Sequence, residues 1–170
     1  VKVLQTLAVE ALITLNAVAL RAELTRRAAH DSLTGLANRA RLAECLDAVM
    51  LGPSAAPHPV GLIVFDLDGF KPINDTLGHE AGDAVLTQVA DRLCACLRRC
   101  DVPARLGGDE FAALIDEAGD RDQVVALAER IIERLRTPMT VDGQLVQVGA
   151  SVGTASPTTV GCSAQLRMVP

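Results

Sequence analysis

Aromatic side chains are almost absent from this sequence. Its 170 residues include three Phe, no Trp and no Tyr. Proteins that bind single-stranded nucleic acid by stacking need exposed aromatic faces, so the composition argues against such a surface. The net charge of −5 also provides no basic field for duplex binding. We therefore expect no nucleic-acid partner.

The sequence also lacks the cysteine pattern of a secreted, disulfide-bonded domain. Its five cysteines are an odd number, and no His lies near the group formed by Cys94, Cys96 and Cys100. A zinc site would need a different spacing of ligands. No signal peptide is visible. We expect reduced thiols that pack as small apolar side chains, in a cytoplasmic protein.

No hydrophobic run is uninterrupted for long enough to predict a membrane span. The apolar segment from Val3 to Leu20 contains Gln5, Glu10 and Asn16, and a charge at mid-span is costly. Steps of four and three between apolar residues instead predict one helix over residues 1–30. This helix would form a weak coiled coil or pack on its own domain. Because the chain begins with Val, we expect a piece of a longer protein.

The remaining pattern predicts one globular α+β domain. The apolar run Val60–Phe65 suits a central strand buried on both faces. Helices are expected over about 38–50, 81–99 and 120–136, with loops over 51–59 and between the strand and residue 81. Two hairpins are expected over 102–115 and 139–155, turning at Gly107-Gly108 and at Asp142-Gly143. This order predicts helices against a mostly antiparallel sheet.

Two acidic motifs could carry chemistry. Asp66 and Asp68 follow the apolar strand, and Asp109 and Glu110 follow the two glycines of a hairpin. Carboxylates at a strand end and at an adjacent turn can converge on one Mg²⁺, which prefers a few carboxylates and phosphate oxygens. Taken singly, Asp66 and Asp68 are better interpreted as turn and cap residues, and Asp109 and Glu110 as a solvated hairpin tip. Lys71, one of two lysines, adds a positive charge beside the first motif.

Five separated blocks, in the same order, resemble the GGDEF domain, the catalytic domain of bacterial diguanylate cyclases. The resemblance covers about residues 31–156 and implies a nucleotide-cyclase-like, ferredoxin-like α+β architecture. The blocks are Asp31–Arg39, Phe65–Lys71 with Asn74, Gly78-His79 and Gly82-Asp83, Arg98–Asp101, Arg105–Phe111 and Ser151–Ala155.

The resemblance implies a reaction in which two GTP molecules condense to cyclic di-GMP and two pyrophosphates. Family members act as homodimers, and each 3′-hydroxyl attacks the α-phosphate of the other GTP. Asp66 and Asp109 would hold Mg²⁺ or Mn²⁺, two ions in each active site, with the Leu67 carbonyl as a further ligand. Glu110 would either hold the metal or activate the 3′-hydroxyl.

The resemblance also assigns substrate and product contacts. Asn74 and Asp83 would read guanine, whose N1–H and N2–H donors suit a carboxylate acceptor; a turn residue and a helix N-cap are the alternatives. Arg98 and Asp101 would bind cyclic di-GMP as an inhibitory site, with a surface ion pair as the alternative. Phosphate contacts are expected from Lys71, Gly69, Phe70, Gly107 and Gly108.

The C-terminal segment departs from the family. Residues 157–170 replace the expected last helix and strand, and no lysine follows Lys71. We divide the chain into a linker helix over 1–30, a GGDEF domain over 31–156 and a non-family tail, and we expect a truncated domain. Residues 1–30 would connect to an upstream sensor, such as a GAF domain. The alternatives to a cyclase are an impaired module that binds GTP or cyclic di-GMP, and a structural partner that dimerises through 1–30.

Overall fold

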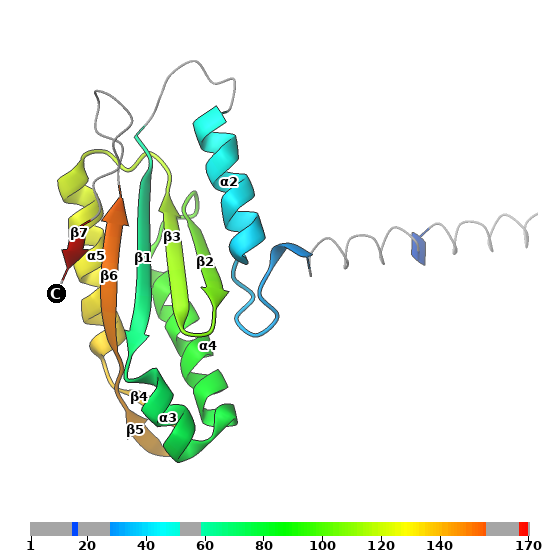
Figure 1. Ribbon diagram of the computed structural model, residues 1–170, viewed down its shortest axis with the longest axis vertical. Coiled ribbons are helices and arrows are strands. Elements are labelled where there is room, and N and C mark those ends of the chain that lie inside the picture. Colours follow the sequence, from blue (N-terminus) through cyan, green and yellow to red (C-terminus); the bar gives the residue numbers. More distant parts are fainter. Residues whose placement is uncertain (1–14, 17–27, 52–58, 156–166, 170) are drawn as a thin grey trace, which may run out of the picture.

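A five-stranded antiparallel sheet forms the centre of the molecule (Figure 1). The computed structural model describes residues 15–16, 28–51, 59–155 and 167–169, so the helix expected over 1–30 lies almost wholly outside the described residues. The strand order is β2-β3-β1-β6-β7. The α+β class with a mostly antiparallel sheet is thus confirmed. The strands are β1 (Gly61–Asp68), β2 (Val102–Gly107), β3 (Glu110–Ile115), β6 (Gly149–Ala155) and β7 (Arg167–Val169).

Helices cover both faces of the sheet. α4 (His79–Cys96) and α5 (Arg121–Arg136) lie together on one face, and α2 (Arg39–Leu51) packs beside β2 on the other (Figure 1). Alternate residues of β1 divide between the two cores, because successive side chains of a strand point to opposite faces. Phe65 packs in the larger core under α4 and α5, whereas Val64 packs against the core under α2. Burial of these apolar side chains drives assembly.

Polar side chains fix where the helices begin and how they dock. Asn38 Oδ1 accepts the backbone N–H of Arg41 at 2.9 Å at the start of α2. Asp120 Oδ1 accepts that of Gln123 at 2.9 Å, which confirms Asp120 as the N-cap of α5. At the other end of α5, the Arg92 guanidinium donates to the carbonyls of residues 134, 135, 137 and 138. These carbonyls have no partner within the helix, so Arg92 joins α4 to the end of α5.

Two sequence-based expectations about the elements are wrong. Residues 70–77, expected as a loop, form helix α3 (Phe70–Leu77), which is followed directly by α4. The expected hairpin over 139–155 is two separate units. β4 (Met139–Val141) and β5 (Gln144–Val146) pair with each other, while β6 pairs with β1 in the main sheet. The helix expected over 81–99 runs from His79 to Cys96, so Arg98 lies beyond its end.

Among the described residues, no helix is long and apolar enough to cross a membrane.

Candidate active site

The two acidic motifs meet where β1 and β3 run side by side. Asp66 of β1 is the register partner of Glu110, the first residue of β3. Asp109 stands in the turn before it, which Gly107 and Gly108 make possible with φ values of +139° and +56°. The turn itself is Gly108-Asp109, since Gly107 still belongs to β2. The structure therefore brings together Asp66, Asp109 and Glu110, three of the four carboxylates that the sequence singled out.

These carboxylates repel one another. The pKa of Asp66 is raised, first by partial desolvation and then by the negative charges of Asp109, Glu110 and Asp68. Asp68 differs from the other three in having a hydroxyl partner, because its carboxylate accepts the Ser151 hydroxyl at 2.9 and 3.1 Å. Leu67, between the two aspartates, has a buried side chain and can offer a ligand only its carbonyl. A cation among these groups would relieve the repulsion.

Glu110 also has a positive partner. Arg39, the first residue of α2, forms a 3.2 Å ion pair with Glu110, and both side chains are more than half exposed. Within the described residues, no three His, Cys, Asp or Glu side chains are gathered closely enough to hold a metal ion alone. A cation here would therefore need water or phosphate oxygens to complete its shell.

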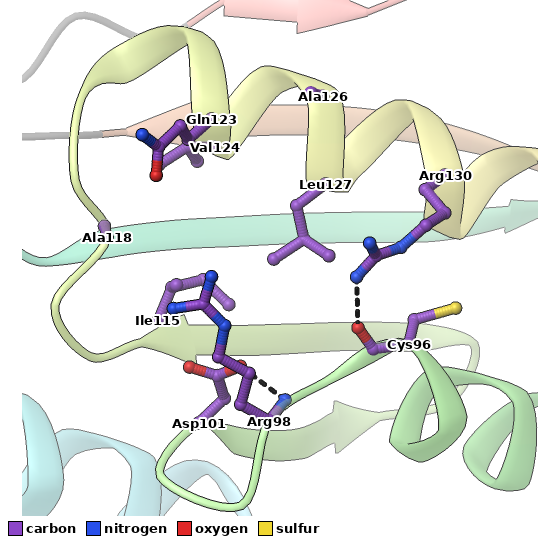
Figure 2. A pocket seen from close by; sticks show the side chains of 10 residues that line it. All are labelled: Cys96, Arg98, Asp101, Ile115, Ala118, Gln123, Val124, Ala126, Leu127 and Arg130. Atoms are coloured by element: carbon purple, nitrogen blue, oxygen red, sulfur yellow. Dashed lines mark hydrogen bonds between the residues drawn. The ribbon is translucent and has the colours of Figure 1, made fainter.

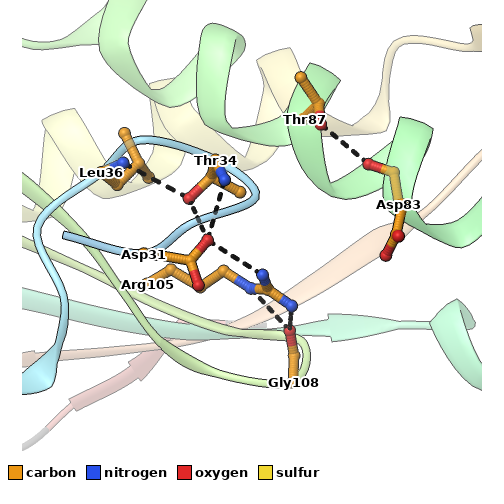
Figure 3. Close-up of polar contacts among 7 residues, drawn as sticks. All are labelled: Asp31, Thr34, Leu36, Asp83, Thr87, Arg105 and Gly108. Carbon is orange, nitrogen blue, oxygen red and sulfur yellow. Dashed lines mark hydrogen bonds and ion pairs between the residues drawn. The ribbon is translucent and has the colours of Figure 1, made fainter. Parts of the chain in front are cut away.

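A partly buried ion pair supports the Gly108-Asp109 turn, called the signature turn below (Figure 3). The Arg105 guanidinium donates to the Gly108 carbonyl at 2.7 and 3.0 Å and to Asp31 Oδ1 at 3.0 Å. Asp31 also accepts the backbone N–H and the hydroxyl of Thr34, at 2.9 and 2.7 Å. Burial opposes ionisation of Asp31, but the bonds from Thr34 and Arg105 outweigh it and lower the pKa. The Asp31–Arg39 segment therefore supports the turn that carries Asp109.

Replacing Asp31 by Asn should destabilise the fold by about 1–3 kcal/mol at pH 7, because the charged partner of Arg105 is lost. The folded-state pKa of Asp31 lies below its reference value of 3.8. Its stabilisation is therefore present above that value and lost as the pH falls through the lower folded-state value. Urea unfolding at several pH values should show the wild type and the variant converging in acid.

Glu44→Gln is the matched control for this prediction. It removes the exposed ion pair between Arg41 and Glu44, whose atoms are 3.1 Å apart. Exposed pairs contribute little, so no measurable change in stability is expected. Equal losses of stability in the Asp31 and Glu44 variants would contradict the role of the partly buried Asp31–Arg105 pair.

The residues expected to bind nucleotide lie on α3 and α4. Gly69 precedes α3, and no side chain caps this helix, so its first N–H groups are open to an anion. Phe70 is buried and Lys71 is exposed at this end. Asn74 lies further along α3, and its side chain rests against α4. Gly69, Phe70 and Lys71, three of the residues expected to contact phosphate, therefore lie together at the start of α3, one to two turns before Asn74.

Asp83 occupies the second turn of α4, and its carboxylate points away from the helix (Figure 3). Its backbone carbonyl accepts the Thr87 hydroxyl at 2.9 Å. The N-cap of α4 is Gly78, so the alternative interpretation of Asp83 as an N-cap is excluded. The Asp83 side chain is exposed and has no structural partner among the described residues. It is therefore free to bind a ligand.

Arg98 and Asp101 lie at a second location. They line a cavity of about 230 Å³ between the end of α4 and α5, together with Arg130, whose guanidinium donates to the Cys96 carbonyl at 2.6 Å (Figure 2). Asp101 precedes β2, whereas the signature turn follows it, so the two sites lie at opposite ends of this strand. Asp101 accepts the backbone N–H of Arg98 at 2.7 Å. No ion pair joins their side chains in this described segment, which argues against a simple surface ion pair.

Comparison with known proteins shows which family has both this fold and these motifs. The family described as the diguanylate cyclase GGDEF domain matches residues 28–165. The chain belongs to this GGDEF family. The bifunctional diguanylate cyclase/cyclic di-GMP phosphodiesterase MucR of Pseudomonas aeruginosa is 40% identical over 133 residues. These cover 78% of this chain but 19% of MucR, so the chain spans about a fifth of that relative.

Solved GGDEF structures superpose on most of the chain. The isolated GGDEF domain of TpbB from Pseudomonas aeruginosa is 38% identical, with a TM-score of 0.71 over 75% of this chain and 74% of that one. The coiled coil and GGDEF domain of DgcB from Caulobacter crescentus, in complex with cyclic di-GMP, is 28% identical. Its TM-score is 0.76, over 89% of this chain and 82% of that one.

Sequence reasoning assigned no role to three residues of this GGDEF domain that contact the signature turn or strand. Asp31, Arg39 and Arg105 lie inside recognised motifs, but the ion pairs that they form join residues more than 70 positions apart in the chain. Their charges are the feature of the sequence that could have pointed to them. Arg39 pairs with Glu110, and Arg105 pairs with Asp31 and donates to the Gly108 carbonyl beside the acidic site. The four described cysteines, Cys45, Cys94, Cys96 and Cys100, are free thiols. Cys96 is buried and Cys45 is half-buried, but Cys94 and Cys100 are exposed, so the expectation that the cysteines pack as apolar side chains is wrong for these two.

Proposed function

We propose that this chain is a diguanylate cyclase domain that condenses two GTP molecules into cyclic di-GMP and two pyrophosphates, as a cytoplasmic homodimer. The observation that carries the proposal is the juxtaposition of Asp66 and Glu110 as cross-strand partners beside the Asp109 turn. The raised pKa of Asp66 supports it, because the cluster is under electrostatic strain that a cation would relieve.

The donor set fits a magnesium or manganese ion. Mg²⁺ is usually held by one or two carboxylates, with water and substrate phosphates completing its shell. Asp66 and Asp109 would supply the carboxylates and Leu67 its carbonyl. Glu110 would either add a ligand or accept the proton of the 3′-hydroxyl. Bound there, two such ions would neutralise charge that develops on the transferring phosphate.

The chain's own residues would then orient the nucleotide. The open N-terminus of α3 and Lys71 would hold the phosphates, with the glycines of the signature turn allowing close approach. Asn74 and Asp83 would bind the guanine edge. In each half-reaction, the 3′-oxygen of one GTP bonds to the α-phosphorus of the other. The bond from that phosphorus to the bridging oxygen breaks, pyrophosphate leaves, and the hydroxyl proton passes to a base.

The test is turnover of GTP by the purified chain with Mg²⁺ or Mn²⁺, with cyclic di-GMP detected by mass. Asp109→Ala is the control. Product that is absent from the control supports the proposal. A folded chain that forms no product but binds cyclic di-GMP would overturn it in favour of a binding module. A chain that binds neither nucleotide but still dimerises would indicate a structural role.

We also propose that Arg98 and Asp101 bind cyclic di-GMP and inhibit the enzyme. Arg98→Ala should weaken cyclic di-GMP binding about 10- to 100-fold, because a charge-assisted contact to phosphate or guanine is lost. Isothermal titration with cyclic di-GMP measures this effect. The matched control is Arg99→Ala, since Arg99 is exposed in the same turn but does not line the cavity. Equal weakening in both variants would indicate a general charge effect.

A further inference from the structure

The contact between α3 and α4 depends on a residue that has no side chain. Gly82 is buried in the first turns of α4, directly before Asp83. A Cβ added to it would overlap Oδ1 of Asn74, would lie 2.9 Å from Asn74 Cγ and would lie 3.3 Å from Phe70 Cζ. Even the alanine side chain therefore does not fit while Asn74 keeps its position. The Asn74 amide rests on the bare backbone of residue 82.

Packing, rather than hydrogen bonding, holds the Asn74 side chain. No hydrogen bond to its amide is formed within the described part of the chain. Its backbone carbonyl accepts the Gly78 N–H at 3.0 Å, which fixes the turn between the two helices. The amide thus lies against the residue that precedes Asp83, with its polar atoms unused. Such a group is available to a ligand but is easily displaced.

We infer that Gly82 is a positioning residue for guanine recognition: the absence of its Cβ creates the space that the Asn74 amide occupies, against the residue that directly precedes Asp83 in the chain. The inference rests on the proposed function, in which Asn74 and Asp83 together bind the guanine edge. The overlapping atom is the end of a rotatable side chain, so Gly82→Ala displaces Asn74, while the buried Phe70 ring needs to shift only slightly. Alanine also favours the helix more than glycine does, which supports retention of the fold.

The experiment compares Gly82→Ala, Asn74→Ala and the double variant in steady-state turnover of GTP. Gly82→Ala should raise KM for GTP roughly tenfold, the loss expected for one hydrogen bond to the base, with kcat within twofold of the wild type. In the Asn74→Ala background the same substitution should have no further effect, because the clashing atom is already gone. Asp91→Ala, an exposed change on α4, is the control for general effects on the helix.

A measurement without ligand tests the positioning role of Gly82 separately from the proposed cyclase function. Asn16, Asn38 and Asn74 are the three asparagines of the chain, so the side-chain amide signals of Asn74 can be assigned by their loss in Asn74→Ala. These signals should shift in Gly82→Ala and stay in place in Asp91→Ala. Unshifted signals, or an equal rise in KM in the Asn74→Ala background, overturn the inference. A wild-type chain that does not turn over GTP refutes the proposed function instead, and the amide signals still decide the positioning role.

Discussion

Asp66→Asn is expected to stabilise the metal-free chain and to reduce cyclic di-GMP formation roughly 100- to 1000-fold. The pKa of Asp66 is raised in the folded state, so its ionised form is disfavoured there. A raised folded-state pKa means that the charge destabilises the fold at neutral pH and that this cost disappears as the pH falls through that pKa. The Asn side chain has the same shape without the charge. We therefore expect Asp66→Asn to raise stability and to lower activity, because the charge that the reaction needs is unfavourable in the metal-free fold.

Thermal unfolding with and without Mg²⁺ measures the change in stability, and detection of cyclic di-GMP by mass measures the change in activity. The variant should unfold at a higher temperature than the wild type in a chelator at pH 7, and the difference should close in acid. A cation that binds the folded state stabilises it, so Mg²⁺ should raise the midpoint of the wild type and leave the variant almost unchanged. Equal stabilisation of both proteins by Mg²⁺ would place the cation elsewhere.

Asp68→Asn is the matched control. Asp68 lies on the same strand and faces the same side, two residues from Asp66, but its carboxylate is hydrogen-bonded to Ser151. Its effect on the pKa of Asp66 is also the smallest of the three acidic neighbours. We expect a much smaller loss of activity and an unchanged response to Mg²⁺. A comparable loss would mean that net charge, rather than the position of Asp66, matters.

The long elements of the fold were predictable because local pattern and tertiary burial agree in them. The apolar run of β1, the hairpin of β2 and β3, and the Asp120 cap of α5 are signals within a few residues of one another. α3 was missed because its eight residues include Pro72 and two residues typical of turns, Asn74 and Asp75. Proline is accommodated there in the first turn of the helix.

The second hairpin was mispredicted for a tertiary reason. Apolar residues continue from β5 into β6, so the sequence pattern shows no break between the strands. The partner of β6 is β1, about 85 residues earlier in the chain. Such pairing depends on sheet order, which no local pattern specifies. The same limit applies to the site: the carboxylates were found from motifs, whereas Arg39, Arg105 and Gly82 act through contacts that folding creates.

Phe111→Ala should lower the free energy of unfolding by about 3–5 kcal/mol, the usual cost of removing a buried aromatic ring. Phe111 has no exposed surface. Its ring stacks on that of Phe65, with centroids 5.5 Å apart and planes inclined by 8°. The two residues are register partners, and each is next to a carboxylate of the site: Phe65 precedes Asp66 and Phe111 follows Glu110. The pair therefore sets the spacing of β1 and β3 at the point where the carboxylates meet.

Urea unfolding measures this loss, with Phe111→Leu as the control that keeps most of the apolar volume. We expect the Leu variant to lose about half as much stability, because it leaves a smaller cavity and loses only the ring contact. With three Phe and no other aromatic residue in the chain, no second ring is available to refill the space beside Phe65 except Phe70, which already packs against α4. A loss below about 1 kcal/mol in Phe111→Ala would show that the core relaxes around the gap. In that case the Phe65–Phe111 stack does not align Asp66 with Glu110. The alignment would then depend on the backbone register of β1 and β3 and on the contacts of Arg105 with Gly108 and Asp31.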